Sequence, residues 1–316
     1  MINAFDKIYK NSEYLKPWNY PLVSFPYVVD VELTNYCNLA CRMCPHTLMK
    51  RDKGYMEETV LKKIVDECAL NGAAIRFIRW GEHLLHQNIF EYISYAKSKG
   101  VIVHLTTNGI LLDRAKAEKL IDCGLDSVIF SMQGATKEAY EIMRDNNKYD
   151  LLEKNIRYLV EIRQNKGVKN PVIHISSTMT DETQDEIKAF KDKWMGIVDS
   201  VGIGVTTFEY VNTPENQENV KEFTSKQYVR KEYRPCTEVL TKLSVNWNGD
   251  VTACCGDYDS FLLLGNIKEK SLKEIWNSEK EKKIREILGR LEMDKLPLCK
   301  DCYATYEELR PQDIKR

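Results

Sequence analysis

Between residues 27 and 210, short apolar segments alternate with amphipathic segments, and this alternation constrains the fold more than any other feature of the chain. The apolar segments, such as YVVDVEL and VIVHLTT, have the length and β-branched content of buried strands. The stretches between them, such as EETVLKKIVDECALNG, carry apolar residues at helical spacing. Six such strand and helix units predict an α/β fold, in which a parallel sheet with helices outside forms a partial (β/α)6 barrel similar to a TIM barrel.

The composition of the chain changes after this alternating region. Polar residues dominate 211–235, which predicts a linker between a barrel domain at 27–210 and a small C-terminal domain at 236–316. In that domain LSVNWNGDVTACCGDY predicts a β-hairpin with its turn at 248–250, and SLKEIWNSEKEKKIREIL predicts one or two short helices. Residues 1–26 form an N-terminal extension. Five of the ten cysteines fall in the small domain, which suggests that a metal holds it together.

The overall composition bears on cellular setting and partners. With 43% hydrophobic and 29% charged residues and a net charge of −1, the chain has an ordinary globular composition that indicates neither nucleic-acid nor membrane binding. The N-terminal stretch MINAFDKIYKNSEYLKPW has no uninterrupted apolar run, so we expect no signal peptide, no membrane span and a cytoplasmic location. In a reducing compartment, clustered cysteines indicate metal binding or catalysis rather than disulfides.

Three cysteines are gathered in the sequence CNLACRMC, directly after the first predicted strand. Cys37, Cys41 and Cys44 have the spacing CxxxCxxC, and active sites of parallel barrels are built at this end of the strands. Iron-sulfur clusters are held by thiolates, and three thiolates leave one iron of a four-iron cluster open for a substrate or cofactor. A zinc knuckle completed by His46 is the structural alternative.

This motif, in its position after the first strand, resembles that of the radical S-adenosylmethionine (SAM) superfamily, and the resemblance covers nearly the whole chain. It implies that Cys37, Cys41 and Cys44 hold a [4Fe-4S] cluster, that SAM chelates the open iron, and that the reduced cluster cleaves SAM to a 5′-deoxyadenosyl radical. RWGEH resembles the family's GGEP sequence, which binds the SAM amino group. Gly81 and Glu82 match that sequence, whereas Trp80 and His83 replace its first glycine and its proline.

Further segments resemble the SAM-binding parts of the family. TTNG and FSMQG resemble the segments that end strands three and four, which implies cofactor contacts for Asn108 and Ser131. Gln133 stands where an aspartate is common. Arg144 resembles an arginine that lies near SAM, and Met43 replaces an aromatic residue that packs on the adenine, a contact that a thioether can also make.

The C-terminal cysteines resemble those of the SPASM or twitch extension, which houses an auxiliary cluster. The resemblance implies one auxiliary [4Fe-4S] cluster on Cys236, Cys254, Cys299 and Cys302, because the further cysteines of a full SPASM pattern are missing. Cys255 is left uncoordinated, and its thiol is a candidate hydrogen-atom donor to a carbon radical. A zinc ribbon made by the same four cysteines is the structural alternative.

The resemblance leaves the reaction and substrate open. Transfer of an electron from the substrate radical to the auxiliary cluster gives two-electron dehydrogenation, whereas return of a hydrogen atom gives epimerisation. About two dozen residues precede the first strand, fewer than the leader-binding domain of many peptide-modifying relatives, so we expect a small polar substrate such as a sugar, cyclitol or nucleotide sugar. The alternatives are a peptide-modifying maturase and a non-catalytic metal-binding or electron-transfer protein. The expected electron donor is a flavodoxin or ferredoxin.

Four other ionisable residues lie within the predicted strands or at their ends. Glu32 and Glu209 are candidates for substrate contact or proton transfer. His104 and His174 lie within strands, where a buried core histidine is the simpler interpretation.

Overall fold

The computed structural model describes residues 23–208, 210, 211, 214, 216, 218, 221, 229–233, 236–300, 302 and 306–309. The strands are β1 (Val28–Val31), β2 (Ala74–Phe77), β3 (Val103–Thr107), β4 (Ser127–Gln133), β5 (Val172–Met179), β6 (Ser200–Val205), β7 (Val229–Tyr233), β8 (Lys242–Val245), β9 (Asp250–Thr252), β10 (Leu263–Asn266) and β11 (Tyr306–Leu309). The α-helices are α2 (Glu58–Asn71), α3 (Ile89–Ser98), α4 (Arg114–Asp122), α5 (Lys137–Arg144), α6 (Tyr149–Asn165), α7 (Gln184–Met195), α9 (Glu238–Thr241), α10 (Leu272–Trp276) and α11 (Glu279–Gly289). Short 3-10 helices are η1 (Pro45–Thr47), η2 (His83–Leu85) and η3 (Met293–Lys295).

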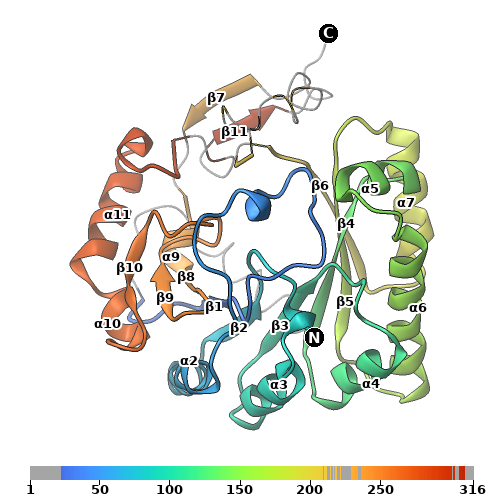
Figure 1. Ribbon diagram of the computed structural model, residues 1–316, viewed down its shortest axis with the longest axis horizontal. Coiled ribbons are helices and arrows are strands. Elements are labelled where there is room, and N and C mark those ends of the chain that lie inside the picture. Colours follow the sequence, from blue (N-terminus) through green and yellow to red (C-terminus); the bar gives the residue numbers. More distant parts are fainter. Residues whose placement is uncertain are drawn as a thin grey trace.

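The largest sheet of the described chain has nine strands in the order β10-β9-β8-β1-β2-β3-β4-β5-β6. Strands β1 to β6 are parallel and stand in chain order. Figure 1 shows this part of the sheet curving into an open barrel, with α2, α3, α4, α6 and α7 on its outside. The predicted α/β fold with a partial (β/α)6 barrel is confirmed.

The two faces of the barrel strands differ in polarity, because alternate residues of a strand point to opposite faces of the sheet. The outer face, beneath the helices, is apolar and fully buried at Val31, Phe77, Leu105 and Phe130. The inner face has a polar layer, made by four residues that are register partners on adjacent strands: Asp30, Arg76, His104 and Ser127. The barrel interior is thus lined by polar groups rather than filled by a hydrophobic core.

The C-terminal hairpin extends the barrel sheet. Strand β8 pairs in parallel with β1, and the β8–β9 hairpin predicted from the sequence is formed, with Gly249 at φ 93° in its turn. A positive φ is accessible to glycine at little cost, which explains its place there. Cys254 and Cys255, in the loop that directly follows β9, are therefore positioned by a strand of the same sheet as the barrel.

The segments outside this sheet are described in part. Strand β7 lies within the predicted linker and pairs antiparallel with β11. Most of the remaining linker, the first 22 residues of the N-terminal extension, and the candidate Glu209 lie outside the described residues. Among the described residues, no helix has the length and apolar character needed to cross a membrane.

Candidate active site

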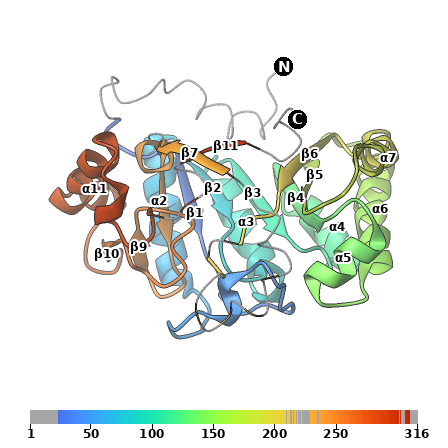
Figure 2. The ribbon, with the colours of Figure 1, turned by 90° about the horizontal axis from the view of Figure 1, so that it is seen from above.

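The three cysteines of CNLACRMC lie in the loop after β1, which also contains η1. In Figure 2 this blue loop lies at one end of the barrel. Cys37, Cys41 and Cys44 line a cavity of about 120 Å³. Five of the predicted cofactor-binding residues line the same cavity: Gly81, Glu82, Asn108, Ser131 and Arg144. They come together because parallel strands place their carboxyl ends at one edge of the sheet.

Glu82 is held rigidly between the ends of β2 and β3. Its carboxylate is 1% exposed and accepts hydrogen bonds from the Thr107 hydroxyl and the Asn108 backbone N–H, both at 2.8 Å. Burial raises the pKa of Glu82, while these hydrogen bonds oppose the shift. The neighbouring Gly81 is required sterically, since a Cβ there would lie 2.1 Å from the carbonyl oxygen of Thr34.

Arg144 connects the cysteine loop to the end of β4. Its Nη2 donates to the backbone oxygens of Ser131 at 2.8 Å and Met132 at 3.1 Å, and its Nη1 donates to the sulfur of Cys41 at 3.4 Å. Its Nε is buried and has no partner among the described residues. The Asn108 side chain donates to Asn38 Oδ1 at 2.8 Å. A cation beside a thiol and an unpaired buried donor suit an anionic ligand at this point.

Met43 and His46, two other residues of the cysteine loop, differ in position, because only His46 lines the cavity with the thiols. Met43 contacts a small apolar cluster of Met143, Phe208 and Val211 and is not among the residues that line the cavity, so its adenine contact stays a prediction. His46 is buried, and its Nε2 is hydrogen-bonded to the backbone oxygen of Asn35 at 2.8 Å. This contact occupies a ring nitrogen that a zinc knuckle could otherwise use.

A second thiol set lines a larger cavity of about 530 Å³. Its members are Cys236, Cys254, Cys255, Cys299 and Cys302. Four residues line both this cavity and the cavity at the first thiol set: Ile78, Arg79, Trp80 and Thr106. The two thiol sets therefore face one another across a shared wall, a relationship that no local sequence pattern reveals.

The environments of Cys254 and Cys255 differ. Cys254 interacts electrostatically with Cys236 and Cys302, whereas Cys255 interacts with Glu238, Asp30 and Arg76. The sulfur of Cys255 lies 3.9 Å from Glu238 Oε2. Contact between the two neighbouring thiols raises the pKa of Cys254 and lowers that of Cys255. Cys254 thus faces the other C-terminal thiols, and Cys255 faces a carboxylate at the cavity wall.

Burial also shifts the pKa of four other thiols among the predicted ligands. Burial raises the pKa of Cys37 to about 11 and that of Cys44, Cys236 and Cys299 to about 12. Ligation of a metal requires thiolates, so binding of iron at either set displaces protons.

The donor chemistry fits iron-sulfur clusters better than single metal ions. All seven predicted ligands are thiols, the usual ligands of such clusters. Within the described ranges no three histidine, cysteine or acidic side chains converge as they would around one metal ion. Thiols spread around a cavity match a cluster, in which each sulfur binds a different iron atom. The residues present therefore fit the predicted cofactors.

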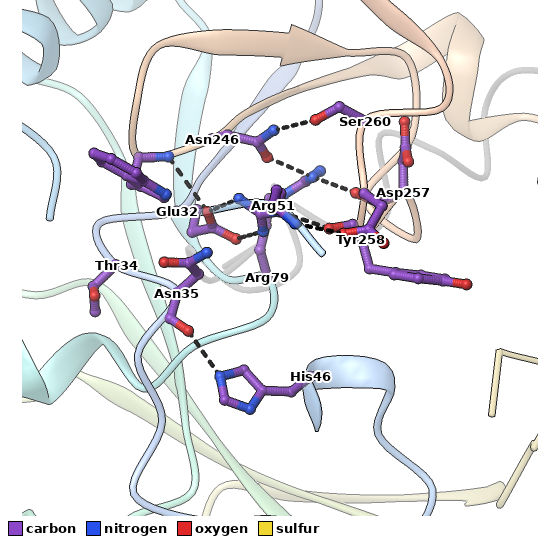
Figure 3. Close-up of polar contacts among 12 residues, drawn as sticks. Glu32, Thr34, Asn35, His46, Arg51, Arg79, Asn246, Asp257, Tyr258 and Ser260 are labelled. Carbon is purple, nitrogen blue, oxygen red and sulfur yellow. Dashed lines mark hydrogen bonds and ion pairs between the residues drawn. The ribbon is translucent and has the colours of Figure 1, made fainter. Parts of the chain in front are cut away.

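Glu32, a candidate from the sequence, forms part of the framework. It is fully buried and forms an ion pair with Arg51, at 2.6 Å between Oε1 and Nη1 (Figure 3). Burial alone would raise the pKa of Glu32, but the Arg51 guanidinium holds it below its ordinary value. Arg51 also donates through Nε to the Tyr258 carbonyl oxygen at 2.6 Å. The pair joins β1 to the loop after β9, so its structural role is to connect two parts of the sheet.

Arg79 makes a second connection and is a residue that the sequence analysis missed. Its Nη2 donates to Asn246 Oδ1 and to the Asp257 carbonyl oxygen, both at 2.7 Å (Figure 3). Its Nη1 donates to the Cys254 carbonyl oxygen at 3.0 Å. Its backbone φ is 136°, a strained conformation for a residue with a side chain. The only sequence signal was its place just before Trp80 and Gly81 in RWGEH.

The inner face of the barrel contributes further polar groups near the second cavity. Arg76 lines that cavity and pairs with Asp30 through its Nη2, 2.7 Å from Oδ2. Glu238 also lines it and is bound at both oxygens by Lys242 Nζ at 2.7 Å. His104 is fully buried, and its Nδ1 lies 2.8 Å from the hydroxyl oxygen of a serine on β4.

Burial also lowers the pKa of both strand histidines. It holds the pKa of His104 well below its ordinary value and lowers that of His174 to about 4. Both imidazoles are therefore neutral at pH 7, which agrees with the interpretation of buried core histidines.

Two thiol sets that line adjoining cavities of one α/β barrel, with a shared wall between them, are the arrangement expected of an iron-sulfur protein with two cluster sites. Comparison with known families agrees. The model of the radical SAM superfamily matches residues 31–194, and that of the SPASM iron-sulfur cluster-binding domain matches residues 236–303. The chain belongs to the radical SAM superfamily. It is a radical SAM enzyme whose cofactors are SAM and a [4Fe-4S] cluster, and its SPASM region implies auxiliary iron-sulfur cluster binding.

Individual relatives differ in the reactions that their names describe. The chain is 25% identical over 309 residues to a tungsten-containing aldehyde ferredoxin oxidoreductase cofactor-modifying protein of Pyrococcus furiosus, with 86% of each chain covered. It is 23% identical over 285 residues to an S-adenosyl-L-methionine-dependent 2-deoxy-scyllo-inosamine dehydrogenase of Niallia circulans, covering 87% of this chain and 92% of the relative. The structure of Streptococcus suis SuiB bound to its precursor peptide SuiA shares the fold, with TM-score 0.68, 16% identity and coverage of 94% and 77%.

Proposed function

We propose that this radical SAM enzyme removes two electrons from a small polyhydroxylated ring substrate of the cyclitol or sugar class. The observation that carries the proposal is the cavity of about 530 Å³ that shares a wall with the SAM-side cavity and is lined by the second thiol set. A substrate there lies between the two sites. The dehydrogenase named for 2-deoxy-scyllo-inosamine, which this chain covers over 92% of its length, supports the same substrate class.

We assign the cofactor-binding roles to the following residues. Cys37, Cys41 and Cys44 hold the SAM-binding cluster, which supplies the electron that converts SAM to methionine and a hydrogen-abstracting 5′-deoxyadenosyl radical. Glu82 and Arg144, which both line the small cavity, orient SAM. The auxiliary cluster ligands are Cys236, Cys254, Cys299 and Cys302.

Dehydrogenation requires that the substrate radical lose one more electron and one proton. An auxiliary iron-sulfur cluster beside the cavity would accept this one electron from the substrate radical. Glu238 is the carboxylate that lines the cavity, and we assign it to accept the hydroxyl proton. The product then carries a carbonyl in place of a secondary alcohol.

Epimerisation is the second candidate, and the position of Cys255 favours it. Its thiol lines the cavity and lies 3.9 Å from Glu238 Oε2. Transfer of its hydrogen atom to the substrate radical completes a new C–H bond and leaves a thiyl radical. One electron from the external donor and one proton then restore the thiol.

Anaerobic turnover in deuterated water tests the two candidates and the peptide alternative together. The reconstituted enzyme is given SAM, reductant and 2-deoxy-scyllo-inosamine, or a metabolite extract as a wider pool, and the products are analysed by mass spectrometry. A product that has lost two hydrogens supports dehydrogenation, whereas a product of unchanged composition with one non-exchangeable deuterium supports epimerisation. SAM cleavage that is coupled only to peptides refutes the small-substrate proposal.

A further inference from the structure

Trp80 occupies the shared wall between the two cavities. It lines both the SAM-side cavity and the larger cavity at the second thiol set. The indole Nε1 is buried and has no hydrogen-bond partner among the described residues. A buried tryptophan N–H usually finds a partner, and leaving it unpaired costs free energy. An unpaired donor at a cavity wall therefore indicates a ligand that accepts a hydrogen bond.

The indole is held in a fixed orientation by two tyrosines. Tyr210 and Tyr258 meet it edge to face, with ring centroids 6.0 Å and 6.1 Å away and interplanar angles of 88° and 86°. The two tyrosines also contact one another at 5.9 Å. The Tyr258 backbone is in turn bound by Arg51. The aromatic wall is thus anchored to the polar framework, and its geometry is set before any ligand binds.

The cavity lining combines apolar and polar groups. Ile78 and Leu262 are apolar neighbours of Trp80 in the lining. Arg76, Thr106 and Glu238 supply charged and hydroxyl groups to the same cavity. A saturated ring with hydroxyl substituents matches both kinds of lining, because its C–H faces are apolar and its rim is polar.

We propose that Trp80 is a specificity-determining residue for the ring substrate. Its Nε1–H donates a hydrogen bond to a ring hydroxyl, and the rest of the indole supplies apolar contact to the ring's C–H groups. This inference rests on the proposed function, because it assumes that the larger cavity receives a cyclitol or sugar. It goes further by assigning recognition to a residue at which the chain departs from the glycine of the related sequence motif.

Substrate binding without turnover tests this assignment. The probe is 2-deoxy-scyllo-inosamine, titrated anaerobically by calorimetry into the reconstituted, SAM-loaded and unreduced enzyme. Trp80→Phe keeps a ring and removes the N–H, so we expect the Kd for the probe to rise about tenfold. Trp80→Leu removes the aromatic face as well and is expected to weaken binding further. The iron content is expected to stay within error of wild type, and the Kd for SAM to change less than the Kd for the probe, although Trp80 also lines the SAM-side cavity. Because Trp80 packs against Tyr210 and Tyr258, the melting temperature is expected to fall in both variants.

The matched control is Trp247→Phe. This tryptophan also donates through Nε1, but its partner is the backbone oxygen of Asp52 at 3.1 Å, and it does not line either cavity. We expect its substitution to leave probe affinity unchanged. Equal probe affinity in Trp80→Phe and wild type, or an equal loss of SAM affinity, would overturn the assignment. A wild-type enzyme that binds neither the probe nor other cyclitols and sugars overturns the proposed function, and the role of Trp80 with it.

Discussion

Substitution of Arg79 gives a direct test of how the barrel and the C-terminal hairpin are joined. The side chain makes three good hydrogen bonds, to Asn246, Asp257 and Cys254, and a longer one of 3.3 Å to Thr252. Arg79→Ala leaves the buried acceptors without this donor. We expect the hairpin, and the thiol of Cys254 with it, to lose its fixed position against β2.

The size of the effect follows from these contacts. A hydrogen bond to a charged group contributes about 1.5–3 kcal/mol, and the three good bonds are not additive because water enters the vacated space. We therefore expect the free energy of unfolding to fall by about 3–5 kcal/mol. Since φ of Arg79 is 136°, Arg79→Gly relieves backbone strain that Arg79→Ala keeps, and is expected to be about 1 kcal/mol more stable than the alanine variant.

Urea unfolding of the metal-free protein, followed by tryptophan fluorescence, measures these differences, and iron analysis after reconstitution reports on the auxiliary site. Arg157→Ala is the control, because Arg157 is half-exposed and pairs with Glu153 on the same helix. Such a pair contributes a few tenths of a kcal/mol. If Arg79→Ala costs no more than Arg157→Ala and keeps its full iron content, the reasoning about the connection is wrong.

Three further predictions concern the two sites and pH. Cys41→Ala is expected to abolish SAM cleavage while Cys254→Ala keeps uncoupled cleavage, measured as 5′-deoxyadenosine; equal loss in both would mean that the second site supports the whole fold. Gly81→Ala places a Cβ against the Thr34 carbonyl, so we expect the free energy of unfolding to fall by about 1–3 kcal/mol. We also expect weaker SAM binding by calorimetry, and unchanged SAM affinity would contradict this. Burial raises the pKa of Glu281 to about 7, although the ion pair with Arg285 opposes the shift, so we expect stability that is present below pH 4.5 to be lost as pH rises through 7. Glu281→Gln is expected to flatten that pH dependence in urea titrations, and an unchanged slope would exclude this carboxyl as its source.

Local sequence patterns predicted the features that depend on local physics. Alternation of strand and helix periods is enough to require a parallel sheet, and the order of the six strands then follows from short right-handed connections. The spacing of Cys37, Cys41 and Cys44 placed three thiols in one loop. The glycine and glutamate of RWGEH lie beside them, because all parallel strands end at the same edge.

Other features depend on contacts between residues far apart in the chain. Parallel pairing of β8 with β1 joins segments more than 200 residues apart, and no local pattern encodes which edge of the sheet the hairpin extends. Glu32 lies near the strand ends in sequence, but its ion pair with Arg51 makes it part of the framework. Trp80 was only a departure from a motif, and Arg79 was missed, until the structure showed the hairpin and the cavities that surround them.

The sequence by itself therefore determined the class of fold, the number of thiols and their chemistry, because these depend on periodicity and on residue type at short spacing. Only the tertiary structure decided that the two thiol sets share a cavity wall and that Cys255 faces Glu238 while its neighbour faces the other thiols. The physical reason is that the direction of a side chain at a strand end is fixed by the packing of segments distant in sequence. Those contacts form only when the sheet closes around them.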